Sequence, residues 1–523
     1  MNLKVLILLL LITSILPVFG NEPNNAIRWL EVKEKIEHRS SDSKKVNEKP
    51  ILRPIEKSKL KPNDLNSVGI ISTGITGIDP NVWNGLDEQT LSRKLELLPN
   101  LNFHSAQRFL KRILISETQP PTSSSKSLMS GKLYFLAKID KLIEFGALDE
   151  AETIILQAPK MNRELFIRWQ KISFVTGRLT SLCEVLKNNF DLSHDLSVRI
   201  ICLKYLNDWQ AAALTLSTAS SLNLLNKSRE NLLIYHLDQN VMPFENLTLN
   251  FSQFDEIDYF IIKSTYQMID QISEDVKYLS MYVKDSSNVE RKVQAIEKLA
   301  MKKSINISSL FDVYRNSDIY GSLGIWQRMI SIRNLDMALK RNNEKSMLIA
   351  LDRAINHMFR GDLLLLFATE YGDRLSNFLL RQKITKFNDD YAIIFALKGE
   401  IPSNWKNYKP NDNLIEMAFK IASNDSINVL DLQKAVRLVS SNLSVYDLST
   451  KHTDGKDLTI QEFKTSKGSL ILEALKISAQ GINTPPEALY SSLFLLLQAE
   501  EAILAKSILI EYLIQSYMMK SQT

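Results

Sequence analysis

A short pattern recurs at intervals of about thirty residues in the first half of the chain. Its three copies are Gly146–Ala151, Gly177–Leu182 and Asn207–Ala212. Each copy begins with glycine or asparagine, which tolerate the left-handed conformation in which many helices end. An apolar residue follows two positions later and another residue of the buried face three positions beyond, which is helical spacing. The pattern therefore predicts stacked helical hairpins.

The three copies assign structural roles to individual residues. Turn positions fall on Gly146, Gly177 and Asn207. The first inward-facing position falls on Leu148, Leu179 and Trp209. The second falls on Ala151 and Ala212, whereas Leu182 takes this place in the middle copy. We expect all of the inward residues, including the indole of Trp209, to pack in the core.

The first twenty residues form a segment of their own. Lys4 is followed by an apolar run, by Pro17 and by small residues up to Gly20. This arrangement predicts a secretory signal peptide over residues 1–20 that is removed after Gly20. The alternative is an uncleaved anchor over residues 3–19, because that length is close to the shortest that spans a bilayer.

Composition divides the remainder of the chain. Residues 21–66 are rich in Lys and Glu and poor in apolar residues, which predicts a flexible, disordered tether. The rest contains few Gly and Pro, as expected for a chain of helices. We assign an N-terminal helical-repeat region to residues 67–260 and a C-terminal region, which continues the repeats, to residues 261–523.

Several local expectations accompany this division. The glycine-containing segment 68–80 is expected to lie as an extended strip along the first helices, since it lacks the Gly-Lys-Ser/Thr ending of a phosphate-binding loop. Gly399 and Gly481 are expected to end helices. Residues 447–467 are expected to form a polar connecting loop. The basic stretch 289–303 is expected to be a solvated helix face, with contact to anionic lipid or polymer as the alternative.

The two cysteines of the chain are Cys183 and Cys202. If a helix ends near Asn189 and the next begins near Leu196, antiparallel packing places the two cysteines level with each other. Level positions on one seam can meet the Cα separation that a disulfide needs. We therefore predict a disulfide, which an exported protein would retain. The alternative is two separately buried thiols.

The sequence contains no recognisable candidate for a catalytic site. The six histidines have no metal-ligand spacing, and neither Gly-X-Ser-X-Gly nor a Ser-X-X-Lys in a suitable context occurs. We expect no enzyme activity, no cofactor and no metal. Aromatic residues in the repeat region could line a ligand groove, but their helical spacing favours core packing; they are Tyr134, Phe135, Phe166, Trp169, Phe174, Trp209 and Trp326.

The strongest copy resembles a tetratricopeptide repeat. Gly146, Leu148, Ala151 and Ala158 match its turn and second-helix positions, whereas the early Pro159 and the period near thirty depart from it. The whole chain resembles uncharacterised exported helical-repeat proteins of alphaproteobacteria, with a signal peptide, a charged tether, a Val82-Trp83-Asn84-Gly85-Leu86 start and a Leu-rich end. The resemblance implies an all-α fold, a right-handed α-solenoid of TPR-like hairpins, and an envelope location.

Two classes of function remain. The first is a periplasmic scaffold whose helical-repeat surface binds an unidentified envelope protein, because stacked repeats give an extended surface. The second is an enzyme accessory of envelope polymers such as peptidoglycan, or a protein that binds lipid or a small ligand. Interspersed charges and a net charge of +5 argue against nucleic acid as a partner. Peripheral membrane contact would come from the N-terminal segment, and the oligomeric state is left open.

Overall fold

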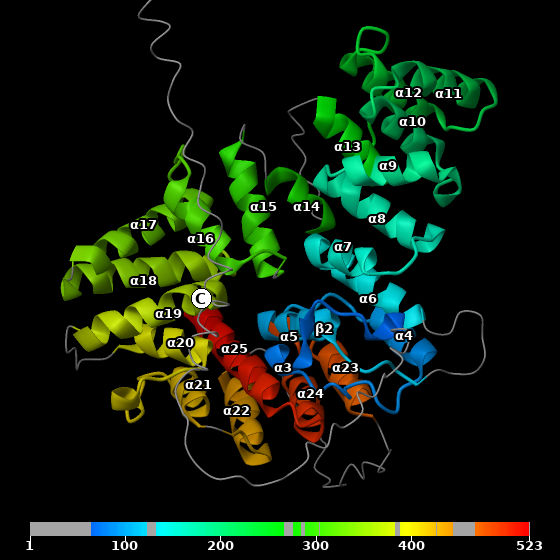
Figure 1. The fold of residues 1–523 in the computed structure, drawn as a ribbon. Coiled ribbons are helices and arrows are strands. Elements are labelled where there is room, and N and C mark those ends of the chain that lie inside the picture. Colours follow the sequence, from blue (N-terminus) through cyan, green and yellow to red (C-terminus); the bar gives the residue numbers. More distant parts are fainter. Residues whose placement is uncertain are drawn as a thin grey trace, which may run out of the picture. The chain divides into compact units, whose positions relative to one another are not determined.

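The computed structural model describes residues 64–122, 132–265, 276–283, 288–302, 304–341, 343–381, 388–424, 426–442 and 466–521. Contacts divide the chain into Met1–Lys61 and Pro62–Thr523, and everything described here belongs to the second unit. The described part contains 23 α-helices, and 72% of it is helical (Figure 1). The predicted helical class is confirmed. The expected signal peptide, most of the tether and most of the 447–467 loop lie outside the described residues.

The first described segment combines short elements with two helices. In chain order these are η1 (Leu65–Ser67), β1 (Ile71–Ser72), α3 (Thr73–Thr76), α4 (Glu88–Glu96), α5 (His104–Ile115) and β2 (Ser116–Glu117). β1 and β2 pair in parallel, with Ile71 opposite Ser116. Gly69 must lack a side chain here, because a Cβ would lie 2.5 Å from the backbone nitrogen of Glu117. The expected extended strip thus contains a strand and a short helix.

The end of the expected tether is already structured. Asn66 is buried, and its Nδ2 donates to Glu88 Oε1 at 3.0 Å. The same carboxylate accepts from the backbone N–H of Leu133 at 2.6 Å, and Asn66 Oδ1 accepts from that of Phe135 at 3.0 Å. Asn66 and Glu88 therefore satisfy N–H groups that a helix leaves free at its start.

The predicted hairpins follow in the expected places. The six helices are α6 (Leu133–Glu144), α7 (Leu148–Leu156), α8 (Arg163–Thr176), α9 (Thr180–Asn188), α10 (Leu196–Tyr205) and α11 (Trp209–Ser221). Each packs against the next along the chain. A short η2 (Phe190–Leu192) separates α9 from α10.

The remaining elements are also helical. They run as α12 (Lys227–Leu237), η3 (Phe244–Asn246), η4 (Phe251–Gln253), α13 (Glu256–Thr265), α14 (Val276–Val283), α15 (Val289–Met301), α16 (Ile307–Asn316), α17 (Ile325–Arg341), α18 (Glu344–Arg360) and α19 (Leu364–Arg381). The last group is α20 (Asp389–Lys398), η5 (Ser403–Trp405), α21 (Asn413–Ser423), α22 (Val429–Asn442), α23 (Lys467–Ile477), η6 (Gly481–Asn483), α24 (Pro486–Gln498) and α25 (Ala502–Lys520). α13 crosses the boundary that the sequence placed at residue 260.

Two glycines expected to end helices differ in their roles. Gly399 has φ 79° and caps the C-terminus of α20, as predicted. Gly481 also has a left-handed φ of 64°, but it begins η6, three residues after the Ser478 cap of α23. A Cβ on Gly481 would lie 2.8 Å from the Cβ of Asn102. The glycine is therefore required by a close approach as well as by its conformation.

Asn and Asp side chains cap the starts of many helices. An Asn or Asp side chain accepts from a free N–H in the first turn of many helices. The caps at α8, α10, α11, α12, α15, α16, α18, α20 and α21 are Asn162, Asp195, Asp208, Asn226, Asn288, Asn306, Asn343, Asn388 and Asp412. Each helix start is thereby fixed by its own sequence.

Helices from the two ends of the described chain pack together. α25 contacts α5 as well as α20, α21, α22 and α24, and α23 contacts α4 (Figure 1). The backbone N–H of Asn102 donates to the carbonyl of Ala479 at 2.9 Å. Contacts across almost the whole sequence therefore hold the N-terminal helices against the C-terminal ones.

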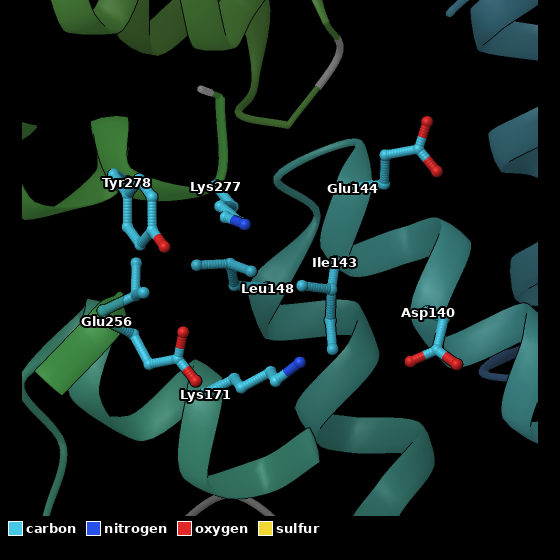
Figure 2. A pocket seen from close by; sticks show the side chains of 9 residues that line it. Asp140, Ile143, Glu144, Leu148, Lys171, Glu256, Lys277 and Tyr278 are labelled. Carbon is cyan, nitrogen blue, oxygen red and sulfur yellow. The ribbon is translucent and has the colours of Figure 1, made fainter. Parts of the chain in front are cut away.

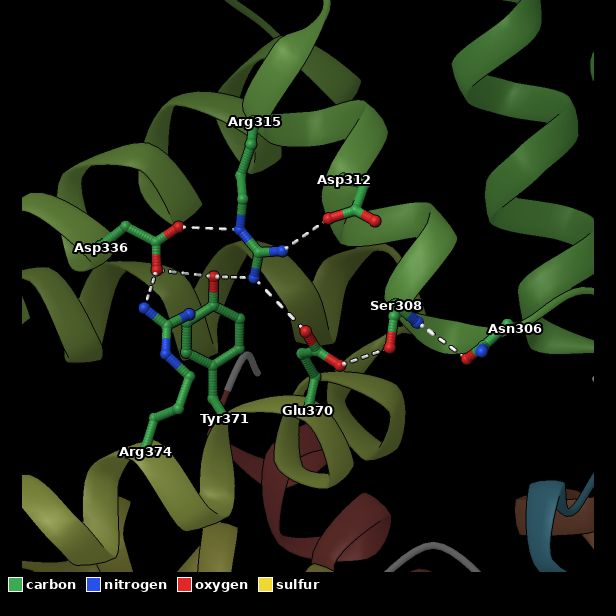
Figure 3. A network of polar contacts seen from close by, with 8 residues as sticks. All are labelled: Asn306, Ser308, Asp312, Arg315, Asp336, Glu370, Tyr371 and Arg374. Carbon is green, nitrogen blue, oxygen red and sulfur yellow. Dashed lines mark hydrogen bonds and ion pairs between the residues drawn. The ribbon is translucent and has the colours of Figure 1, made fainter. Parts of the chain in front are cut away.

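A polar network joins α16, α17 and α19 (Figure 3). Asp336 accepts from Arg315 Nε at 3.0 Å and from the hydroxyl of Tyr371 at 3.0 Å, and it pairs with Arg374 at 2.7 Å. Arg315 also reaches Glu370. The network fixes how these helices lie against one another because each carboxylate and guanidinium has several partners.

Candidate functional site

The three turn positions share one backbone geometry. Gly146, Gly177 and Asn207 have φ of 72°, 72° and 63°. At each, the next N–H bonds to the carbonyl five residues earlier, at 2.9 to 3.0 Å, which satisfies a free carbonyl at the helix end. The prediction that these residues end helices is confirmed. The repeat therefore reflects a recurring helix-stop geometry.

The predicted inward positions divide into two groups. Leu148, Leu179, Ala151 and Ala212 are buried, as expected. Trp209 is 50% exposed, so its expected place in the core is wrong. The reason lies in the chain that follows, because α12 packs on α10 and α11 while α13 returns to pack on α8.

The other aromatic residues considered as a groove lie in the core. Tyr134, Phe135, Phe166, Trp169, Phe174 and Trp326 are all buried. The indole of Trp169 donates to Glu152 Oε1 at 3.0 Å, which satisfies its buried N–H. Among the aromatic residues named from the sequence, Trp209 is thus the exposed one. Its indole N–H makes a long bond of 3.4 Å to the carbonyl of Leu237.

The chain from Trp209 onward carries no charge over a long stretch. No charged residue occurs from Trp209 to Asn226, where the average composition would give about four. The buried side of α11 consists of Ala212, Leu216 and Ala219. The outer stripe, at a spacing of four, three and four residues, consists of Gln210, Leu214, Ser217 and Ser221, which are all exposed.

Apolar side chains stand out on this surface. Leu214 is 70% exposed, Leu222 and Leu224 are exposed at the C-terminal end, and Tyr205 is exposed at the end of α10. We name Tyr205 together with the exposed residues of 209–224 the α11 face, which Asp208 borders. An uncharged surface with exposed aromatic and aliphatic side chains is suited to contact with another protein. The missing charges were visible in the sequence, but the exposure was not.

The disulfide lies next to this face. Cys183 of α9 and Cys202 of α10 are bonded, with a Cα separation of 5.0 Å. The predicted pairing is therefore confirmed, and both cysteines are buried. The bond links α10, which forms a hairpin with α11, to the preceding helix α9.

A shallow pocket of about 200 Å³ lies among α6, α7, α8, α13 and α14 (Figure 2). Its buried lining is apolar, from Ile143, Leu148 and Val175. Its charged lining has both signs, from Asp140, Glu144, Lys171, Glu256 and Lys277. Burial raises the pKa of the Glu256 carboxyl. The pocket is smaller than the roughly 300 to 1,000 Å³ typical of drug-sized ligands.

The expected solvated face at 289–303 is partly wrong. α15 buries Val293, Ile296 and Leu299. Glu297 is also buried, and it receives two bonds from Arg328 at 2.8 and 2.6 Å and one from the hydroxyl of Tyr314 at 2.5 Å. α15 is therefore a packed helix, whose lysines border the protein surface.

Within the described ranges, no group of three or more His, Cys, Asp or Glu residues could hold a metal ion. In the same ranges, one helix, α25, is long and apolar enough to cross a membrane, and 61% of its most apolar window is buried within the protein. Such burial is common for core helices.

Comparison with known proteins gave no relative: no family model, no curated protein and no solved structure matches this chain.

Proposed function

We propose that this chain is a non-catalytic scaffold that binds a protein partner through the α11 face. The observation that carries the proposal is the uncharged stretch from Trp209 to Asn226, in which Trp209 and Leu214 are exposed. Protein interfaces are depleted of charge at their centre and enriched in Trp and Tyr, since these side chains bury much area with little loss of entropy. The α11 face has this composition.

The proposal includes a repeat architecture. In the three hairpins of α6 to α11 the same left-handed turn joins the two helices, which supports a TPR-like right-handed solenoid. In such a stack each hairpin covers its neighbour, so the last one leaves a face open. α11 belongs to the last hairpin of the proposed stack, and the helix that follows, α12, covers it only in part. Trp209 is therefore half exposed where Leu148 and Leu179 are buried.

The proposal also includes an exported, periplasmic location. The apolar start of the chain supports it, either as a cleaved signal over residues 1–20 or as an anchor over residues 3–19. The disulfide between Cys183 and Cys202 adds support, because disulfides persist in oxidising compartments. The partner would then be an envelope protein, as the resemblance to exported helical-repeat proteins implies.

Site-specific photocrosslinking in cells tests the surface directly. A photoreactive phenylalanine analogue replaces Leu214, and a second variant carries it at Ile503, which is 79% exposed at the start of α25. We expect one discrete protein adduct from position 214 and none of the same mass from position 503. Mass spectrometry identifies the adduct.

Purified components complete the test. The identified partner is titrated against the wild-type chain, Leu214→Asp and the matched control Ile503→Asp. A charge in the middle of an apolar interface should weaken binding about tenfold or more, whereas the control should bind like wild type. Equal affinities for all three chains, or identical adducts from both positions, would overturn the proposal. Circular dichroism verifies that each variant is folded.

A further inference from the structure

A second pocket lies where three separate segments meet. The start of α5, the C-terminal turn of α15 and the turn between α18 and α19 enclose a volume of about 260 Å³. Its lining includes His104, Gln107, Lys298, Lys302 and Asp362. None of these residues belongs to the α11 face, so the pocket can be considered independently of the proposed scaffold.

Two buried side chains of the pocket have unsatisfied polar atoms. His104 and Gln107 are each 4% exposed. In the described part of the chain, His104 Nε2 and Gln107 Oε1 have no hydrogen-bond partner. A buried polar atom without a partner is unfavourable by about 1 to 3 kcal/mol. Gln107 Oε1 accepts hydrogen bonds, and so does His104 Nε2 when the ring proton is on Nδ1. An ordered water or a ligand hydroxyl would therefore remove this penalty.

The imidazole is oriented by its other nitrogen. His104 Nδ1 lies 3.0 Å from the carbonyl of Met301, which can only accept, so Nδ1 carries a proton. Nε2 lies 3.9 Å from Asp362 Oδ2, which is too long for a hydrogen bond. The carboxylate of Asp362 is 69% exposed and can therefore move away from the ring.

The pocket also contains two ammonium groups on one helix turn. Lys298 and Lys302 are four residues apart on α15 and its cap, and both line the pocket. Neither forms an ion pair with another described residue, in contrast to Lys111, Arg229 and Arg328. Burial lowers the pKa of Lys302, because the charge loses water there. An anion would offset this loss.

We propose that this pocket binds a small oxyanion that also carries a hydroxyl, a hydrogen phosphate or hydroxycarboxylate group. Its charged oxygens are held by Lys298 and Lys302, and its hydroxyl donates to His104 Nε2. Asp362 is then a competing anion, which the ligand displaces from the mouth of the pocket. The sequence placed these lysines on a solvated face. Because α15 lies beside α5, both lysines line the same pocket.

Calorimetric titration of the full chain with inorganic phosphate and with citrate distinguishes the two oxyanions. Sodium chloride at equal ionic strength serves as the salt control. We expect saturable binding of one of the two anions and none of chloride. The Lys298→Met/Lys302→Met double variant should bind at least about tenfold more weakly, whereas Lys292→Met, a control on the same helix outside the pocket, should bind like wild type.

Asp362→Asn gives a result of the opposite sign. Removal of the competing carboxylate should tighten binding about three- to tenfold. Binding that is absent for both anions, equal in the lysine double variant, or weakened by Asp362→Asn would overturn the proposal. Circular dichroism of each variant verifies that loss of binding does not reflect loss of folding. Loss of this site would leave partner binding by Leu214 unchanged, so the two proposals can fail separately.

Discussion

Glu511, in the middle of the last helix, caps the first turn of α5 at His104. Its Oε1 accepts from the backbone N–H of His104 at 2.8 Å, and Oε2 accepts from that of Ser105 at 3.1 Å. The N-cap position of α5 is Phe103, which has no side-chain oxygen to offer. A carboxylate more than four hundred residues away thus performs the role that Asn or Asp performs locally at other helices.

Replacement of this buried carboxylate should weaken the contact between the chain ends. Glu511→Ala leaves two buried N–H groups without an acceptor, and we expect a loss of about 2 to 4 kcal/mol in the free energy of unfolding. Glu511→Gln retains one acceptor oxygen and should lose less. Chemical denaturation measures both, with the exposed Glu184→Gln on α9 as a control within about 0.5 kcal/mol of wild type. A loss no larger than that of the control would contradict the assigned cap.

Reduction of the disulfide should destabilise the chain. Cys183 and Cys202 are 19 residues apart, and the chain-entropy model gives about 3 kcal/mol for a loop of this size. Thermal unfolding with and without reductant measures the effect. The Cys183→Ala/Cys202→Ala double variant should unfold at a lower temperature and should not respond to reductant. A double variant that still responds would show that the reductant acts elsewhere.

Lys138 should make the stability depend on pH. It is fully buried, its ammonium donates to the carbonyl of Val68 at 2.8 Å, and burial lowers its pKa to about 7. The pKa of an exposed lysine is about 10.4. At pH values between about 7 and 10.4 the unfolded chain therefore binds more protons than the folded chain. The free energy of unfolding should therefore rise as the pH increases from about 7 to 9.

Removal of the amine tests that slope. Lys138→Met should flatten the rise in stability over the same pH range, whereas the exposed Lys187→Met should retain it. Denaturant unfolding at several pH values gives the slopes. Parallel curves for wild type and Lys138→Met would exclude Lys138 as the origin of the pH dependence.

The network around Asp336 offers a comparison between two carboxylates that share Arg315. Asp336 is 13% exposed, while Asp312 is 63% exposed and pairs with Arg315 at 3.1 Å. Asp336→Asn removes the carboxylate charge that Arg315 and Arg374 share, although Arg315 keeps its other carboxylate partners. We expect a loss of about 1 to 3 kcal/mol. Asp312→Asn should lose less than about 0.5 kcal/mol, because a solvated pair contributes little. Equal losses in the free energy of unfolding, measured with urea, would mean that the burial of Asp336 does not determine how much it stabilises the fold.

Local features were predictable from the sequence. The hairpin turns at Gly146, Gly177 and Asn207 could be predicted because a helix stop depends on the conformations open to one residue. The disulfide followed from the two helices on either side of its short loop. Asn and Asp caps likewise accept from N–H groups within four residues along the chain. The positions of the helices could therefore be predicted without knowledge of distant parts of the chain.

Exposure and long-range contacts were not predictable in the same way. Trp209 has the inward position of its hairpin, yet it is exposed because the following helices return toward α8. Lys298 and Lys302 appear solvated in the sequence, and the pocket they line exists only because α5 lies beside α15. Helices alone do not determine which neighbour covers which face.

The sequence by itself determined the helical class, the hairpin turns of the repeat and the cysteine pair, since each depends on residues close together in the chain. The tertiary structure decided which apolar face stayed uncovered, where unpaired lysines meet buried polar atoms, and that Glu511 completes the start of α5. These features depend on packing between segments far apart in sequence, and such packing is the sum of many weak contacts that no local pattern encodes.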